Sequence, residues 1–161
     1  MPNHGNVFEE LLSGYFTTYY TEHPADATYV GLSSGEGRFN NATLPALRRQ
    51  HRRRQAALGK LDTIAPSALS NEQNLDRLAF RARLLRECED FNLSRHTLDP
   101  HGLDKVFDFL LREMQRGETE PKQAAKNIRN LLRKSPRYLA QALRLIDQPE
   151  RVWRNIMNGT F

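Results

Sequence analysis

Apolar side chains recur at every third or fourth position along most of this sequence, which is the spacing that places them on one face of an α-helix. The first such stretch follows Asn6, which can cap a helix, and stops at Pro24. Its apolar positions are Phe8, Leu12, Tyr15, Phe16 and Tyr19. Pro24 suits the first turn of a short second helix, because no backbone N–H is needed there. The pattern therefore predicts two helices before Gly31.

Two longer helices are predicted in the middle of the chain, after a loop indicated by the glycines and asparagines of residues 31–41. Thr43 can cap the first, with Pro45 in its first turn, and its apolar positions are Leu44, Leu47, Leu58 and Leu61. Ser70 and Gln73 have the spacing of a capping box, which opens the second helix. This helix runs to about Leu93 and carries Leu75, Leu78, Ala82 and Leu85.

The remainder of the chain continues the helical pattern. One stripe consists of Leu103, Val106, Phe107, Leu110 and Met114. Gly117 suits the end of that helix and Pro121 the start of the next, whose apolar positions are Ala124, Ile128, Leu131 and Leu132. Pro136 is expected to bend or interrupt it before Tyr138, Leu139, Ala142, Leu143 and Ile146. Pro149 then starts a last amphipathic segment with Val152, Trp153, Ile156 and Met157.

The fold class follows from these stretches, since no stretch alternates as a strand would. We expect an all-α, irregular bundle of about seven helices with orthogonal and antiparallel packing. No repeat of fixed period is present, so residues 1–161 are expected to form a single domain.

Composition and charge limit the partners and the cellular compartment that are expected for this chain. The net charge is +5, but acidic and basic residues are interspersed, which is typical of solvated helix faces rather than of a nucleic-acid-binding arm. A single cysteine, Cys88, excludes an intramolecular disulfide. No window approaches the ~18 apolar residues that can span a bilayer. The cytoplasm is the default compartment, and export is compatible with the sequence if a leader has been removed.

The sequence offers no candidate catalytic, cofactor-binding or metal-binding residue. The two nearest histidines, His96 and His101, are separated by a proline and lack the one-turn spacing of a helical zinc site. Cys88 lies between two acids that would raise the pKa of its thiol, and it is interpreted as a small residue near the core. No glycine-rich phosphate loop and no serine nucleophile at a strand-to-helix turn are present.

The strongest charge feature is the segment "RRQHRRRQ", in which no acid interrupts the basic residues. Helical spacing places four arginines in one outward sector, which is a candidate surface for an acidic partner: Arg48, Arg49, Arg52 and Arg53. Nucleic acid is disfavoured as that partner, because no aromatic residues are interleaved. Arg54 falls on the apolar side instead, and we expect it to reach an acid of the following helix, namely Glu72, Asp76 or Glu87.

Three segments taken together resemble a known family. "HPADATYVGL", "LGKLDTIAPSALSNEQNLDRLAFRARLL" and "SPRYLAQALRLIDQPERVW" are similar, in this order and spacing, to the N-terminal portion of the bacterial family catalogued as domain of unknown function 885. Its members resemble zinc metallopeptidases and are several times longer than this chain. The resemblance implies zinc only in a C-terminal part with an H-E-x-x-H motif, which no position of this sequence matches.

We therefore expect this chain to be the non-catalytic helical N-terminal domain of a zinc-metallopeptidase-like protein, packing beside the catalytic part or shaping its cleft. The missing catalytic domain, or a second copy of the chain, is expected to contact Trp153, Ile156 and Met157. The alternative is a stand-alone helical interaction module that binds an acidic partner through the arginine-rich face. A small hydrolase ranks last, because no activated nucleophile or metal set can be assembled.

Overall fold

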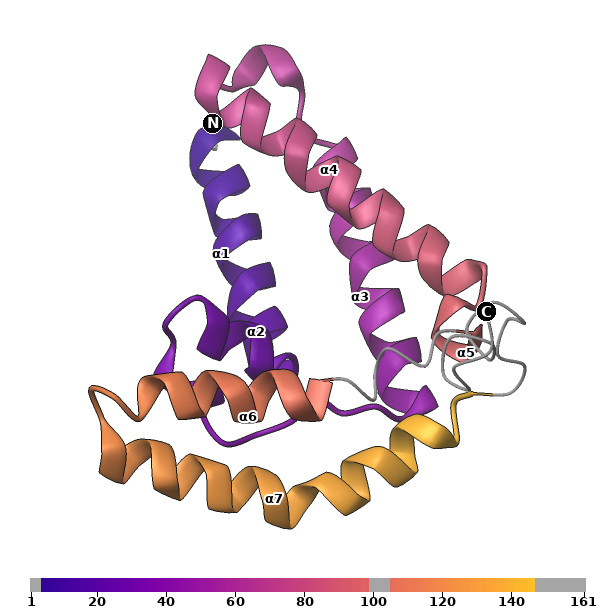
Figure 1. Cartoon of the computed structure of the whole chain (residues 1–161). Coiled ribbons are helices and arrows are strands. Elements are labelled where there is room, and N and C mark those ends of the chain that lie inside the picture. Colours follow the sequence, from indigo (N-terminus) through magenta and orange to yellow (C-terminus); the bar gives the residue numbers. More distant parts are fainter. Residues whose placement is uncertain (1–3, 99–104, 147–161) are drawn as a thin grey trace, which may run out of the picture. The chain divides into compact units, whose positions relative to one another are not determined.

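A computed structural model describes residues 4–98 and 105–146 and confirms the all-α fold class (Figure 1). The described ranges contain seven α-helices and two short 3₁₀ turns, and no strand. The helices are α1 (His4–Glu22), α2 (Pro24–Tyr29), α3 (Leu44–Asp62), α4 (Asn71–Asn92), α5 (Arg95–Leu98), α6 (Lys105–Arg116) and α7 (Pro121–Leu143). The 3₁₀ turns are Ser33–Gly35 and Pro66–Ala68.

Two compact units make up the chain. The first combines residues 1–19 with residues 45–94, and therefore contains most of α1 and of α3 together with α4. The second combines residues 20–44 with residues 95–161, and its described helices are α2, α5, α6 and α7. The expectation of one domain stays a prediction.

The first unit is built on the aromatic face of α1. Its buried cluster consists of Phe8, Tyr15, Ala57, Leu61, Ile64, Phe80 and Leu84. The Tyr15 and Phe80 rings meet edge to face with centroids 5.0 Å apart, and Phe16 lies 5.7 Å from the same Phe80 ring. Each fully buried phenylalanine or leucine contributes about 1.5–3 kcal/mol. The apolar face predicted for α1 is thus confirmed as core, although α1 begins at His4, so Asn6 lies inside the helix and is not its cap.

Helix α4 has apolar residues on two opposite sides. The predicted capping box is present: Ser70 Oγ accepts from the Gln73 backbone N–H and Gln73 Oε1 accepts from the Ser70 N–H. The helix buries Phe80, Leu84 and Cys88 in the core. Leu75, Leu78, Ala82 and Leu85, which mark the helix in the sequence, are exposed. At 3.6 residues per turn, the two faces point about 140° apart.

The second unit begins with the predicted short helix α2, and Pro24 occupies its first turn. The following loop packs back on this helix: the Leu32 N–H donates to the Ala27 carbonyl, and Asn40 Oδ1 accepts from the Ala25 N–H. Gly35 is buried in the same place, where a Cβ would collide with the carbonyl of Pro24. A glycine at position 35 is therefore a condition for this packing.

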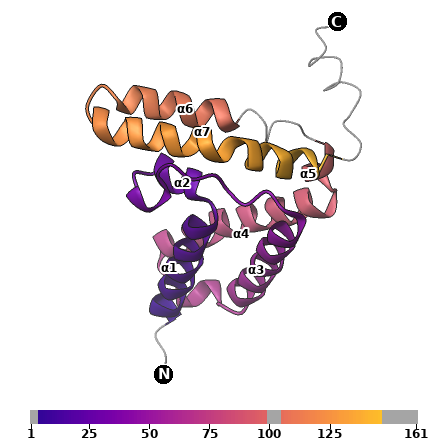
Figure 2. The same cartoon turned by 90° about the horizontal axis from the view of Figure 1, so that it is seen from below.

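Helices α6 and α7 form an antiparallel hairpin and lie side by side in both Figure 1 and Figure 2. The Gly117 N–H donates to the Glu113 carbonyl at the end of α6, and Pro121 starts α7, as predicted. Val106 of α6 and Leu131 of α7 are buried, whereas Phe107, Met114 and Leu132 are exposed, so only part of each predicted apolar stripe is buried. The remaining predicted stripe residue, Leu103, lies outside the described residues.

Of the two effects predicted for Pro136, interruption does not occur, because α7 runs through Pro136, and the helix curves instead (Figure 1). Proline lacks the N–H that would donate to the carbonyl four residues earlier, at Leu132. The Ser135 hydroxyl donates to that same carbonyl at 2.8 Å, so the acceptor stays satisfied. The segment predicted to carry Trp153, Ile156 and Met157 lies outside the described residues.

Replacing Gly35 by alanine tests the packing of the loop on α2. We expect Gly35→Ala to lower the free energy of unfolding by about 3 kcal/mol, because the new methyl group meets the Pro24 carbonyl. Gly59→Ala is the matched control: Gly59 lies inside α3 with no atom within 4 Å of a Cβ, so the substitution should stabilise by about 0.5–1 kcal/mol. Urea unfolding of both variants measures the difference, and equal midpoints would contradict the close approach.

Candidate functional site

The arginine-rich segment forms the middle of α3, within the first unit. Arg48, Arg49 and Arg52 are exposed, which agrees with their predicted outward direction, whereas Arg53 is half-buried. Arg48 and Arg52 make no ion pair with any other residue in the described part of the chain. Their charge is therefore available to an external acidic group.

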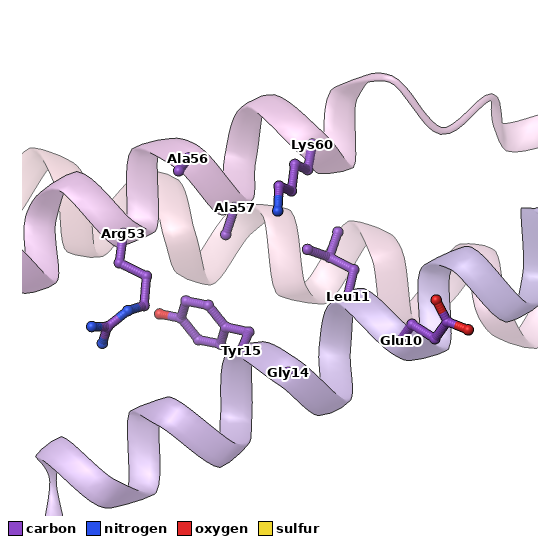
Figure 3. Close-up of a pocket in the computed structure, with 8 residues that line it drawn as sticks. All are labelled: Glu10, Leu11, Gly14, Tyr15, Arg53, Ala56, Ala57 and Lys60. Carbon is purple, nitrogen blue, oxygen red and sulfur yellow. The ribbon is translucent and has the colours of Figure 1, made fainter.

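A groove between α1 and α3 adjoins this surface (Figure 3). Its volume is about 220 Å³, and it is lined by Glu10, Leu11, Gly14, Tyr15, Arg53, Ala56, Ala57 and Lys60. Gly14 and the two alanines leave room between the helices. Figure 3 shows the Arg53 guanidinium beside the hydroxyl end of Tyr15, and the Lys60 ammonium group further along α3. Two cations thus line a groove with a single carboxylate, Glu10.

The cations of this groove continue the arginine surface along one side of α3. Arg49, Arg53, Ala56 and Lys60 follow one another at intervals of four, three and four residues, which is the spacing of one helix face. Such a row can hold several carboxylates of one acidic segment at once. We call Arg48, Arg49, Arg52, Arg53 and Lys60 the cationic face.

Arg54 turns away from the cationic face, as the sequence predicts. Its Nε donates to Glu87 Oε2 at 2.7 Å, and Arg83 Nε donates to the other oxygen at 2.8 Å. The Arg83 guanidinium also stacks over the Tyr19 ring at 4.6 Å. Glu87 was one of the three predicted partners of Arg54, so that hypothesis is confirmed. Because this carboxylate is largely buried, removing it would leave Arg54 partly desolvated without its counter-charge.

The groups around this ion pair are held in their neutral forms. Burial, followed by the nearby Glu87 carboxylate, raises the pKa of the Tyr15 hydroxyl. Burial is also the main cause that raises the pKa of the Cys88 thiol, and Glu87 adds to it. Since the thiolate is the reactive form, this confirms Cys88 as a small residue near the core.

His51 is a buried histidine of α3 whose ring stacks on Phe91 with centroids 4.4 Å apart. Its Nδ1 is buried without a hydrogen-bond partner among the described residues. Burial, and secondarily the charge of Arg54, lowers the pKa of His51 below its usual value. The imidazole is therefore neutral at pH 7 and acts as a packing group.

Sequence reasoning missed a polar cluster in the second unit. Asn127 of α7 and Glu113 of α6, 2% and 4% exposed, are joined by a bond from Asn127 Nδ2 to Glu113 Oε2 at 3.0 Å. Glu36 completes the cluster: Arg116 Nη1 donates to its Oε1 at 2.6 Å, and Gln123 Nε2 donates to its Oε2 at 3.0 Å. Burial opposes ionisation of Glu36, but the hydrogen bonds from Arg116, Asn127 and Gln123 outweigh it and lower its pKa.

A signal for this cluster is present in the sequence. Glu113 follows Val106 by seven residues, and Asn127 stands between Ala124 and Leu131 at helical spacing. A polar residue at an apolar position of an amphipathic helix indicates a buried partner. The cluster joins the α6–α7 hairpin to the loop that contains Glu36, and it is interpreted as a packing element.

Among the described residues, no group of three or more histidine, cysteine, aspartate or glutamate side chains is placed to hold a metal ion. None of the described helices combines the length and the apolar composition needed to cross a lipid bilayer. No family model, no curated protein and no solved structure matches this chain. The resemblance to domain of unknown function 885 therefore stays a prediction.

The environment of His51 predicts how stability depends on pH. Because folding lowers the pKa of this histidine, its neutral form stabilises the folded state above the unfolded value near 6.5, and this contribution is lost as the pH falls through the window below it. We expect His51→Phe, which keeps a ring against Phe91, to gain stability relative to the natural protein as the pH is lowered from about 7 to about 5. Thermal melting of both proteins across this range measures the gain. A constant difference in melting temperature would contradict the assignment.

Proposed function

We propose that this chain is a non-catalytic helical domain of a larger zinc-metallopeptidase-like protein, in which it packs beside the catalytic part or shapes its cleft. The observation that carries the proposal is an apolar face left open on α6. Phe107, Leu111 and Met114 are 75%, 56% and 64% exposed. They follow one another at intervals of four and three residues, so they share one side of the helix.

The second unit does not use this open face for its own packing. The opposite side of α6 already buries Val106, and Glu113 is bonded to α7. Soluble monomers rarely leave a phenylalanine, a leucine and a methionine together in water, and such patches mark interaction sites. Burying each of these side chains is worth about 1.5–3 kcal/mol. An apolar surface of a larger protein is the occupant that the resemblance favours.

In this proposal zinc belongs to the catalytic part alone. The role of the present helices is to provide a shaped wall, because their polar clusters are engaged in packing: Glu87 with Arg54 and Arg83, and Glu113 with Asn127.

The first test is the reading frame beyond the codon of Phe161. We expect it to continue into a segment with an H-E-x-x-H motif, and a stop codon at that point would contradict the proposal. With the following part produced as a separate polypeptide, the present chain should capture it. The double variant Phe107→Ser and Leu111→Ser should weaken capture at least about tenfold, since two large apolar groups leave the interface. Val30→Ser, a change at another exposed apolar residue, is the matched control and should capture normally.

A second candidate function is supported by the cationic face: the chain binds an acidic partner as a stand-alone interaction module. Arg48 and Arg52 lack ion-pair partners within the described ranges, and Arg53 and Lys60 line the groove beside α1. Charge complementarity of this kind attracts and orients an acidic segment.

Binding to an immobilised glutamate-rich peptide tests this second function. We expect the natural chain to be retained at low salt, and the double variant Arg49→Glu and Arg53→Glu to be lost from the column, since repulsion replaces attraction along α3. The control is Lys122→Glu with Lys126→Glu on α7, which has the same spacing and the same change in net charge. If both variants lost retention equally, the binding would depend on net charge alone, and the assignment to α3 would be overturned.

A further inference from the structure

Helix α4 carries an apolar stripe that faces solvent. Leu75, Leu78 and Leu85 are 68%, 53% and 40% exposed. Ala79 and Ala82 lie among them and are exposed as well. The helix needs no such face for its own unit, because it already buries Phe80 and Leu84 on the other side. We call Leu75, Leu78, Ala82 and Leu85 the leucine stripe, and Ala79 borders it.

The spacing of the leucine stripe is that of a helix–helix seam. Leu75, Leu78, Ala82 and Leu85 are separated by three, four and three residues, which corresponds to the a and d positions of a heptad. The same intervals are read from either end. A second α4 laid antiparallel on the first therefore places Leu75 opposite Leu85 of the second copy, and Leu78 opposite Ala82. Each layer of the seam thus pairs two leucines or a leucine with an alanine.

Charged residues beside the stripe are arranged for the same antiparallel pairing. Glu72, Ala79 and Arg86 succeed one another at intervals of seven residues, so they lie along one flank of the stripe. Between antiparallel helices, this flank of one copy lies against the same flank of the other in reverse order. Glu72 then meets Arg86 of the second copy, and Arg86 meets its Glu72. Both side chains are exposed and make no ion pair within the described part of this chain.

The other flank presents Arg81, which would approach Arg81 of the second copy. This repulsion is reduced within each chain, because Arg81 Nε donates to Asp62 Oδ1 at 2.8 Å. A parallel arrangement forms no such ion pairs. In parallel helices the flank with Glu72 and Arg86 would face the flank of the second copy that carries Asn74 and Arg81.

We infer that α4 is the interface of a homodimer, in which the leucine stripes of two copies pair antiparallel and two Glu72–Arg86 ion pairs close one flank. The interface is isologous, as expected for a two-fold symmetric dimer. It lies on the first unit and uses no residue of the open α6 face. It can therefore hold or fail independently of the proposed function.

Sedimentation equilibrium over a range of concentrations tests the dimer. The natural chain should approach twice the 18.6 kDa mass of one chain as its concentration rises. Glu72→Arg alone and Arg86→Glu alone should each raise the dissociation constant at least about tenfold, because two attractions become two repulsions. An equimolar mixture of the two variants should dimerise again, since the antiparallel arrangement then pairs arginines with glutamates only. Circular dichroism checks that both variants keep the helical content of the natural chain.

The control Phe107→Ser should dimerise like the natural chain, because Phe107 belongs to α6. A natural chain that stays monomeric at every concentration would overturn the inference. So would a mixture of the two charge variants that pairs no better than either variant alone. Loss of the dimer in Phe107→Ser with retention in Glu72→Arg would move the interface to α6 and equally overturn the assignment to α4.

Discussion

The packing of Phe80 and Leu84 into the core of the first unit determines most of what that unit presents to its surroundings. The Tyr15 and Phe16 rings of α1 contact Phe80, and Leu84 is fully buried in the same cluster. These contacts fix the rotation of α4 about its own axis. With this rotation Glu87 reaches Arg54 of α3, and Leu75, Leu78 and Leu85 point to solvent. The Arg54–Glu87 ion pair and the exposure of the leucine stripe both follow from the burial of Phe80 and Leu84.

In the second unit, buried polar groups fix how the helices pack. Glu113 and Asn127 occupy positions where the amphipathic pattern would place apolar side chains, and they are bonded to each other between α6 and α7. A buried carboxylate is tolerated only when its hydrogen bonds are made, so this pair specifies how the two helices must meet. Glu36 extends the network to the loop after α2, which thereby becomes fixed to the hairpin. Rotation of α6 is again set by its buried side, and Phe107 and Met114 remain outside.

Helical periodicity predicts most elements of this fold, and it predicts the burial of α1 because the aromatic side chains of Phe8, Tyr15, Phe16 and Tyr19 lie on one side of that helix. It fails for α4, where Phe80 and Leu84 are as apolar as Leu75 and Leu78 and the sequence offers no reason to prefer either set. The choice is made by contacts with α1, which are remote in sequence. Arg54 was predictable, since an arginine on an apolar face needs a nearby acid. The groove beside Tyr15 was not, because it depends on Gly14 of α1 and Ala57 of α3 lining the same space from two helices that are remote in sequence.

The three open surfaces differ in what their charges allow. The cationic face of α3 has one sign only, so it repels a second copy of itself and suits an acidic partner. The α6 face is bordered by Asp108 and Arg112, but these charges would not meet opposite charges if a second α6 were laid antiparallel on the first. A different surface therefore fits the α6 face better than another α6 does. The leucine stripe alone combines a symmetric apolar spacing with opposite charges at its two ends. Self-recognition requires both features, because an isologous contact must satisfy the same residues twice. For this reason we assign the proposed second copy to α4, and the proposed binding of other proteins to the surfaces that lack such symmetry.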